Sequence, residues 1–150
     1  MFRKAHSGDL LAIVALLADD PLGAAREIAA ERPDRAYLDA FAAIDADSNQ
    51  LLAVAVDDDD RVIGCLQLSF IPGLSRTGMW RGQIESVRIA ANHRGSGLGA
   101  AMIEWAVEQA RARGCGLVQL TSDKRRPDAI RFYEKLGFVA SHEGLKLDLS

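Results

Sequence analysis

The feature that most constrains this chain is a set of alternating glycines placed between a strand pattern and a helix pattern. The glycines are Gly95, Gly97 and Gly99; a β-rich run over 80–90 precedes them, and the apolar stripe of a long helix follows over 97–113. Glycine lets a backbone approach a ligand closely, and the first amides of a helix have no partner within the helix. Because the helix dipole also favours negative charge at that end, the segment predicts a site for a diphosphate-like anion.

Two other phosphate-binding motifs fit this segment less well. Gly95-x-Gly97-x-x-Ala100 formally satisfies the dinucleotide fingerprint, which keeps a nicotinamide-dependent oxidoreductase as an alternative. That fingerprint requires a turn directly after the strand, whereas residues 91–94 separate the strand from the first glycine here. Only about fifty residues follow Gly99, too few for a full doubly wound sheet. A Walker phosphate loop is excluded because no Gly-Lys-Ser or Gly-Lys-Thr follows.

Length and charge exclude several classes of function. The 150 residues are the length of one domain, and 18 basic against 21 acidic residues leave a net charge of −3. A broad basic surface for nucleic acid is therefore not expected, and the predicted anion site is local. Arg3 and Lys4 precede an apolar run over 10–18 in the order of a secretory signal, but Asp9 adjoins that run, and it is too short to span a membrane. We expect a single cytoplasmic domain, 1–150, with neither a nucleic-acid nor a membrane partner.

The order of the hydrophobic patterns predicts an α+β, mixed-sheet domain. The expected strands cover 1–5, 51–56, 61–71, 80–90 and 115–121, with one or two more within 138–149. The expected helices cover 8–18, 34–45, 97–113 and a segment entered at Pro127 and closed by Gly137, and the clearest loop covers 72–78. Cys65 and Cys115 lie in strand patterns and have no metal-binding spacing, so we expect reduced thiols and no metal site.

Two motifs carry a resemblance to a known family, Arg94-x-x-Gly97-x-Gly99 and the stretch from Ala129 to Phe138. The first looks like the Q/R-x-x-G-x-G/A signature of the GNAT superfamily of N-acetyltransferases, and the second is similar to the A-x-x-F-Y-x-K-x-G-F motif of the same superfamily. The resemblance implies the acyl-CoA N-acyltransferase fold, in which helices flank a central mixed, mostly antiparallel sheet. It also implies a transferase that moves an acetyl group from acetyl-CoA to an amine.

By the same resemblance, acetyl-CoA lies between the strand that ends near Ala90 and the strand over 115–121. The end of the first strand then pairs with the pantetheine arm like an added strand, and the amides of the glycine turn hold the pyrophosphate. The cofactor-binding residues so implied are Val87, Arg88, Ile89, Arg94, Gly95, Ser96, Gly97, Leu98, Gly99 and Ala100.

Acetyl transfer to a primary amine by direct attack needs a base for the ammonium and an acid for the leaving thiolate. Simple alternation places Glu85 on the same strand face as Val87 and Ile89, where apolar neighbours would raise its pKa; a strand bulge would alter this. Tyr133 matches the motif tyrosine that resembles the general acid. We expect Glu85 as base, directly or through water, and Tyr133 as acid; a surface glutamate and a core tyrosine are the structural alternatives.

Other features leave alternatives open. Arg126 stands where many superfamily members have Asn, and the basic residues 124–126 either face coenzyme phosphates or an acidic substrate, or form a solvated turn. Arg76, Trp80 and Arg81 are weaker candidates for substrate contacts. The acceptor, a small-molecule or a peptide amine, is not determined. The resemblance is compatible with a homodimer, and a non-catalytic acyl-CoA sensor is an alternative function.

Overall fold

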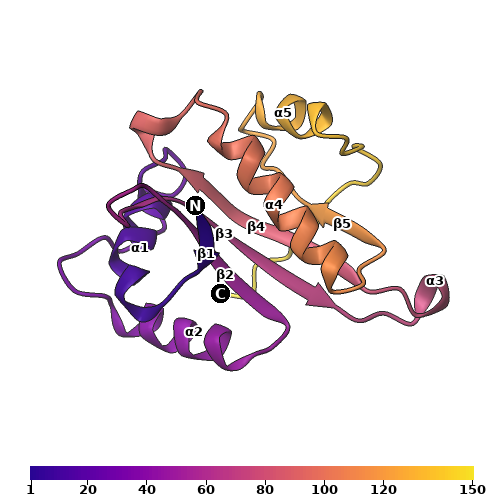
Figure 1. The fold of residues 1–150 in the computed structure, drawn as a ribbon, viewed down its shortest axis with the longest axis horizontal. Coiled ribbons are helices and arrows are strands. Elements are labelled where there is room, and N and C mark those ends of the chain that lie inside the picture. Colours follow the sequence, from indigo (N-terminus) through magenta and orange to yellow (C-terminus); the bar gives the residue numbers. More distant parts are fainter.

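The computed structural model describes all 150 residues, which form a five-stranded sheet covered by helices (Figure 1). The strands are β1 (Phe2–Lys4), β2 (Gln50–Val56), β3 (Val62–Ile71), β4 (Arg81–Ile89) and β5 (Leu117–Leu120). The helices are α1 (Leu10–Ala18), α2 (Arg35–Ala46), α4 (Leu98–Ala112) and α5 (Ala129–Lys135), with one irregular turn, α3 (Ser75–Gly78), in the expected loop. The predicted α+β class is confirmed.

The strands lie across the sheet in chain order, β1-β2-β3-β4-β5. The first four are antiparallel neighbours, and β5 is parallel to β4, to which α4 connects it. The pairing of β4 with β5 ends at Ile84 opposite Leu120. Because β4 continues to Ile89, its last residues have no strand partner on that side, and the two strands leave space between them.

Alternate residues of the strands belong to two hydrophobic clusters, one on each face of the sheet. Leu66 and Ile84 pack with Met102 of α4 in the first cluster, and Val54 packs with Ile13 of α1 in the second. Each large apolar side chain buried in this way contributes roughly 1.5–3 kcal/mol. The apolar run that forms α1 is thus a core helix, and no helix of the protein is long and apolar enough to cross a bilayer.

A bulge interrupts β4 next to the space between β4 and β5. The register places Ser86 and Val87 of β4 opposite the single residue Leu66 of β3. Ser86 has a φ of 56°, a left-handed conformation in which the extra residue of a bulge can sit. The thiol of Cys65 donates to the carbonyl of Ser86 across 3.7 Å, so β3 holds the bulge in place.

The bulge reverses the expected orientation of Glu85. Ile84 and Val87 both contact the cluster under α4, so Glu85, which follows Ile84, points to the opposite face. The prediction that Glu85 shares a face with Val87 and Ile89 is wrong, because one extra residue shifts the alternation of the strand. The expected apolar surroundings are absent too, since Glu85 is exposed and accepts a hydrogen bond from Gln83.

The C-terminal segment also differs from expectation. No strand forms within 138–149, and beyond Phe138 the only hydrogen bond between two backbone groups runs from the Ser141 amide to the Val139 carbonyl. The alternating residues 145–149 nevertheless have a strand pattern. The prediction of one or two strands there is wrong for the single chain, because a strand needs a neighbour to satisfy its backbone groups and this segment meets none.

Candidate active site

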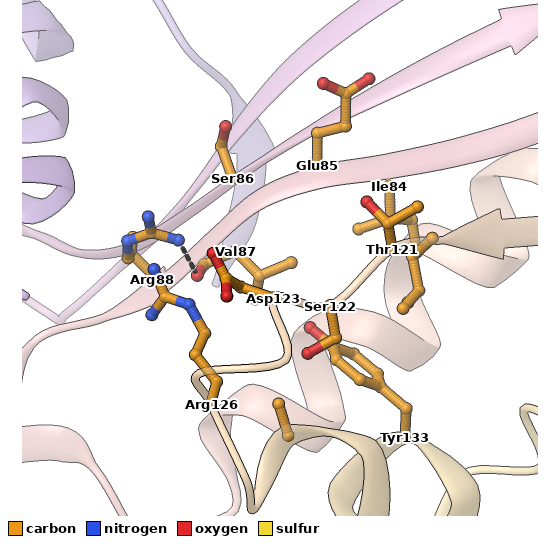
Figure 2. A pocket seen from close by; sticks show the side chains of 12 residues that line it. Ile84, Glu85, Ser86, Val87, Arg88, Thr121, Ser122, Asp123, Arg126 and Tyr133 are labelled. Carbon is orange, nitrogen blue, oxygen red and sulfur yellow. Dashed lines mark hydrogen bonds between the residues drawn. The ribbon is translucent and has the colours of Figure 1, made fainter. Parts of the chain in front are cut away.

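A pocket of about 210 Å³ lies between β4 and β5, beyond their last paired residues (Figure 2). It is lined by 84–88 of β4, by 120–123 at the end of β5, and by Arg126, Ala129 and Tyr133 around α5. Of the site residues expected from the sequence, the pocket brings together Glu85, Val87, Arg88 and Tyr133.

Tyr133 of α5 lines the pocket, and its aromatic ring is packed against two other rings. The ring makes edge contacts with Phe132 and Phe138, at centroid distances of 5.0 and 5.8 Å. Burial raises the pKa of its hydroxyl above the ordinary value of 10.0, and the charges of Arg88 and Arg126 offset only part of that effect. The phenol therefore keeps its proton at neutral pH, as a general acid must.

Glu85 borders the pocket from the other side. In Figure 2 its carboxylate projects from β4 away from Tyr133. Gln83 donates to Glu85 Oε1 across 2.9 Å, and Gln119 of β5 donates to Gln83 across 2.9 Å, so a chain of amides orients the carboxylate. A proton acceptor and a proton donor thus stand on opposite sides of the gap between β4 and β5.

Two arginines of the pocket share one buried carboxylate that sequence reasoning missed. Asp20, in the turn after α1, lies 3.0 Å from Arg126 and 3.3 Å from Arg88. Burial alone would raise the pKa of Asp20, but hydrogen bonds from Arg126 and the Leu22 amide, with the two guanidinium charges, lower it to about 2. Asp20 is therefore ionised at neutral pH and holds both arginines. Nothing local in the sequence connects it with residues so distant along the chain.

The basic turn 124–126 is paired throughout. Lys124 lies 3.7 Å from Glu143 on the surface, Arg125 lies 2.8 Å from Asp123, and Arg126 is held by Asp20. This arrangement does not present three free cations to an anionic ligand. The weaker candidates Arg76, Trp80 and Arg81 are not among the residues that line the pocket, because their loop lies at the opposite end of β4 (Figure 1).

The glycine turn joins the end of β4 to the N-terminus of α4. Gly95 and Gly97 have φ values of 77° and 86°, and a Cβ added to either would meet nothing within 4 Å. Backbone conformation, not crowding, therefore requires glycine at both positions. A Cβ on Gly99 would lie 3.5 Å from Phe132, an ordinary contact.

The backbone amides of residues 95–100 donate to no other group of the chain. The first amide of this region with a partner is that of Ala101, which donates to Gly97. Arg94 and Ser96 are used to shape the turn, since Arg94 donates to the carbonyls of Ile89 and Asp19 and Ser96 donates to that of His93. The result is a row of free N–H groups at the positive end of a 15-residue helix, suited to a pyrophosphate.

The sequence of this chain is similar to those of known proteins. The sequence model of the acetyltransferase (GNAT) family matches residues 10–138. Glucosamine 6-phosphate N-acetyltransferase of Trypanosoma brucei brucei is 39% identical over 89 residues, which are 59% of this chain and 58% of that protein. Aminoalkylphosphonate N-acetyltransferase of Salmonella typhimurium is 32% identical over 108 residues, which are 72% of this chain and 69% of that protein.

A solved structure is similar over the whole chain. The crystal structure described as a transcriptional regulator from Bacillus halodurans superposes with a TM-score of 0.96 at 48% identity, covering 99% of both chains.

Proposed function

This chain belongs to the acetyltransferase (GNAT) family, and we propose that it transfers an acetyl group from acetyl-CoA to a primary amine by direct attack in a ternary complex. The observation that carries the proposal is the row of free amides over 95–100, which follows the strand that lines a pocket with Glu85 and Tyr133 on its two sides. Bound acetyl-CoA supplies the acetyl group as an activated thioester.

The residues that would hold acetyl-CoA are mostly main chain. The amides of 95–100 fit its pyrophosphate, because each can donate without losing a partner within the protein. The unpaired edge of β4 at Val87, Arg88 and Ile89 fits the pantetheine arm, which would add there like a strand. Arg88 already donates to the Val87 carbonyl across 2.9 Å, but a carbonyl oxygen has two lone pairs and can accept a second bond.

Glu85 and Tyr133 divide the proton transfers between them. Glu85, which is exposed and oriented by Gln83, takes the proton of the substrate ammonium directly or through water. Tyr133, kept neutral by burial, donates to the leaving sulfur. Holding the amine beside the thioester supplies most of the acceleration, and each proton transfer adds about 10²- to 10⁴-fold.

We propose a small polar amine as the acceptor. The Trypanosoma and Salmonella relatives are named for amines that also carry a phosphate or a phosphonate. The surroundings of Glu85 support a polar guest, because the side-chain amides of Gln83 and Gln119 form the adjoining sheet surface. Phosphorylated amines are therefore the first acceptors to test.

Residues 1–150 would act as one acetyltransferase domain, and we propose the cytoplasm as its location. Cys65 and Cys115 are both free thiols, which is compatible with a reducing compartment.

The experiment that tests the function is release of free thiol from acetyl-CoA in the presence of single amines. Glucosamine 6-phosphate should be compared with glucosamine, and an aminoalkylphosphonate with an alkylamine of equal chain length, so that the phosphoryl group is the one variable. Amine-dependent thiol release supports the proposal. Calorimetric binding of a nicotinamide dinucleotide in preference to acetyl-CoA would contradict it and favour the oxidoreductase alternative.

A second candidate function is binding of acetyl-CoA without turnover, as a sensor. The observation in its favour is the description of the Bacillus halodurans structure as a transcriptional regulator. The same amides would hold the ligand, so binding alone does not separate the two functions. Saturable acetyl-CoA binding without thiol release for any amine would favour the sensor.

A further inference from the structure

Glu85 and Arg88 lie on the same face of β4, although they are three positions apart. In the register with β3, Glu85 is the partner of Gln67. Arg88 is the partner of Cys65, two positions earlier on β3. Because β3 has no extra residue between these two partners, Glu85 and Arg88 both point to the face opposite α4. The bulge thus brings their backbone positions to about 7 Å from each other, the spacing of two strand residues.

Two guanidinium groups at this face share a single carboxylate. Arg88 lies 3.3 Å from Asp20 and Arg126 lies 3.0 Å from it, and the side chain of Asp20 is only 8% exposed. Figure 2 shows the two guanidinium groups next to each other and apart from the Glu85 carboxylate. The neighbouring pocket carboxylate, Asp123, is already paired with Arg125. Asp20, Arg88 and Arg126 therefore form an ion cluster with one positive charge in excess.

Both arginines of the ion cluster line the pocket and keep unused donors. A guanidinium has five N–H donors, and the hydrogen bond and the ion pair of Arg126 are both made with Asp20. Arg88 uses Nη1 on the Val87 carbonyl and Nη2 on Asp20, and its Nε is buried without a partner. An unpartnered buried N–H costs free energy that a ligand oxygen would recover. The fork of arginine suits the oxygens of a phosphoryl group.

We propose that Arg88 and Arg126 bind the phosphoryl or phosphonyl group of the acceptor and thereby select phosphorylated amines. The inference rests on the proposed acetyltransferase function and assigns the two ends of the acceptor to two parts of one pocket. The ammonium lies at the carboxylate of Glu85, and the phosphoryl oxygens lie at the excess positive charge of the ion cluster. An acceptor with an amine at one end and a phosphoryl group at the other matches this separation of charge.

The first test is direct binding of two matched pairs of amines to the protein saturated with coenzyme A. The pairs are glucosamine 6-phosphate with glucosamine, and aminoethylphosphonate with propylamine. By calorimetry, wild type should bind a phosphorylated amine at least about tenfold more tightly than its counterpart, because its hydrogen bonds are made to charged groups. Arg126→Gln should reduce this preference at least about fivefold, since Asp20 then neutralises Arg88.

Two further variants separate loss of the phosphoryl contact from general damage. Arg126→Lys keeps a charge beside Asp20, so it should stay folded and keep part of the preference, without the fork of arginine. Arg131→Gln is the matched control, because Arg131 of α5 is exposed and does not line the pocket. It should leave the preference unchanged. Circular dichroism checks the fold of each variant.

Turnover of the same amines separates this inference from the proposed function. Thiol release with a preference for the phosphorylated amine that Arg126→Gln lowers supports both. Binding of a phosphorylated amine that depends on Arg126, without thiol release, supports the inference and contradicts the function. Thiol release without any preference supports the function and overturns the inference.

Three binding results would also overturn the inference. The first is a wild type with no preference for either phosphorylated amine, and the second is an equal preference in Arg126→Gln and wild type. The third is a loss of affinity for coenzyme A in Arg126→Gln that exceeds the loss for the phosphorylated amine. That result would assign Arg126 to the phosphates of the coenzyme.

Discussion

Asp20 and Arg126, which are 106 positions apart in the sequence, are joined by contacts of 3.0 and 3.1 Å. Asp20 also reaches Arg88, so one carboxylate ties the turn after α1 to β4 and to the segment that leads into α5. No backbone ladder joins α5 to β4, and this ion cluster supplies a polar link between them. Because Tyr133 is carried by α5, the cluster contributes to holding the phenol against the pocket.

Replacing Asp20 with Asn should destabilise the protein in a pH-dependent way. The folded-state pKa of Asp20 is lowered from 3.8 to about 2, so its stabilising contribution is complete above 3.8 and is lost as the pH falls towards 2. That shift corresponds to about 2 kcal/mol at pH 7. Urea unfolding should show this difference between wild type and Asp20→Asn at pH 7, and little difference at pH 2.

Asp58→Asn is the matched control for this measurement. Asp58 is an exposed carboxylate of the β2–β3 turn, and its replacement should change the free energy of unfolding by less than about 0.5 kcal/mol. If the effect of Asp20→Asn were equal at pH 7 and pH 2, the ion cluster would not be its cause.

Tyr133→Phe should lower kcat and leave the affinity for acetyl-CoA nearly intact. In the proposed mechanism the phenol donates its proton and the amides of 95–100 hold the nucleotide, so the loss should be on the order of 10²-fold in kcat with Kd within about twofold. Burial raises the pKa of Tyr133 above 10.0, so loss of its proton should not limit the wild-type rate below pH 10. Thiol-release kinetics and calorimetry measure the two quantities.

Tyr37→Phe provides the control for that substitution. The Tyr37 hydroxyl accepts from the Ile28 amide and lies outside the pocket, so its loss should leave kcat unchanged. Equal kcat values for Tyr133→Phe and wild type would assign Tyr133 to the core, as the aromatic contacts with Phe132 and Phe138 would by themselves allow.

Glu85→Gln should lower kcat chiefly at low pH. The substrate ammonium needs a base most where little free amine is present, so the defect should be about 10²-fold near pH 6.5 and should shrink towards pH 9. Glu134→Gln, an exposed carboxylate of α5 that does not line the pocket, should leave the profile unaltered. A pH–rate profile of Glu85→Gln that matches wild type would remove Glu85 from the mechanism.

The features that could be predicted from the sequence are those with local causes. Alternation and helical periodicity located β2, β3, β4 and α4 to within a few residues, and the glycine turn followed from three residues and the helix behind them. The features that could not be predicted depend on distant partners. The face of Glu85 depends on the bulge at Ser86, which Leu66 and Cys65 of β3 accommodate.

Asp20 and the C-terminal segment 145–149 illustrate the same limit. No pattern around Asp20 indicates that it meets Arg88 and Arg126, because the fold alone brings the three together. The alternation of 145–149 has the period of a strand, but no strand forms there, because a strand needs an edge that pairs with it. Local chemistry therefore locates the glycine turn, and long-range contacts decide how Glu85 and Tyr133 are oriented.

Gly97 and Gly99 of the glycine turn should differ in how well they tolerate alanine, and binding measurements can check this difference. Gly97→Ala should weaken acetyl-CoA binding at least about tenfold, because alanine tolerates a φ of 86° poorly and the amides that follow would be re-aimed. Gly99→Ala should bind within about threefold of wild type, since Gly99 is helical, helix interiors favour alanine, and the added Cβ would lie at an ordinary distance from Phe132. Calorimetric titration of the two variants with acetyl-CoA, and with coenzyme A as the product, measures both effects. Equal losses in the two variants would mean that close approach to the ligand, and not backbone conformation, requires the glycines.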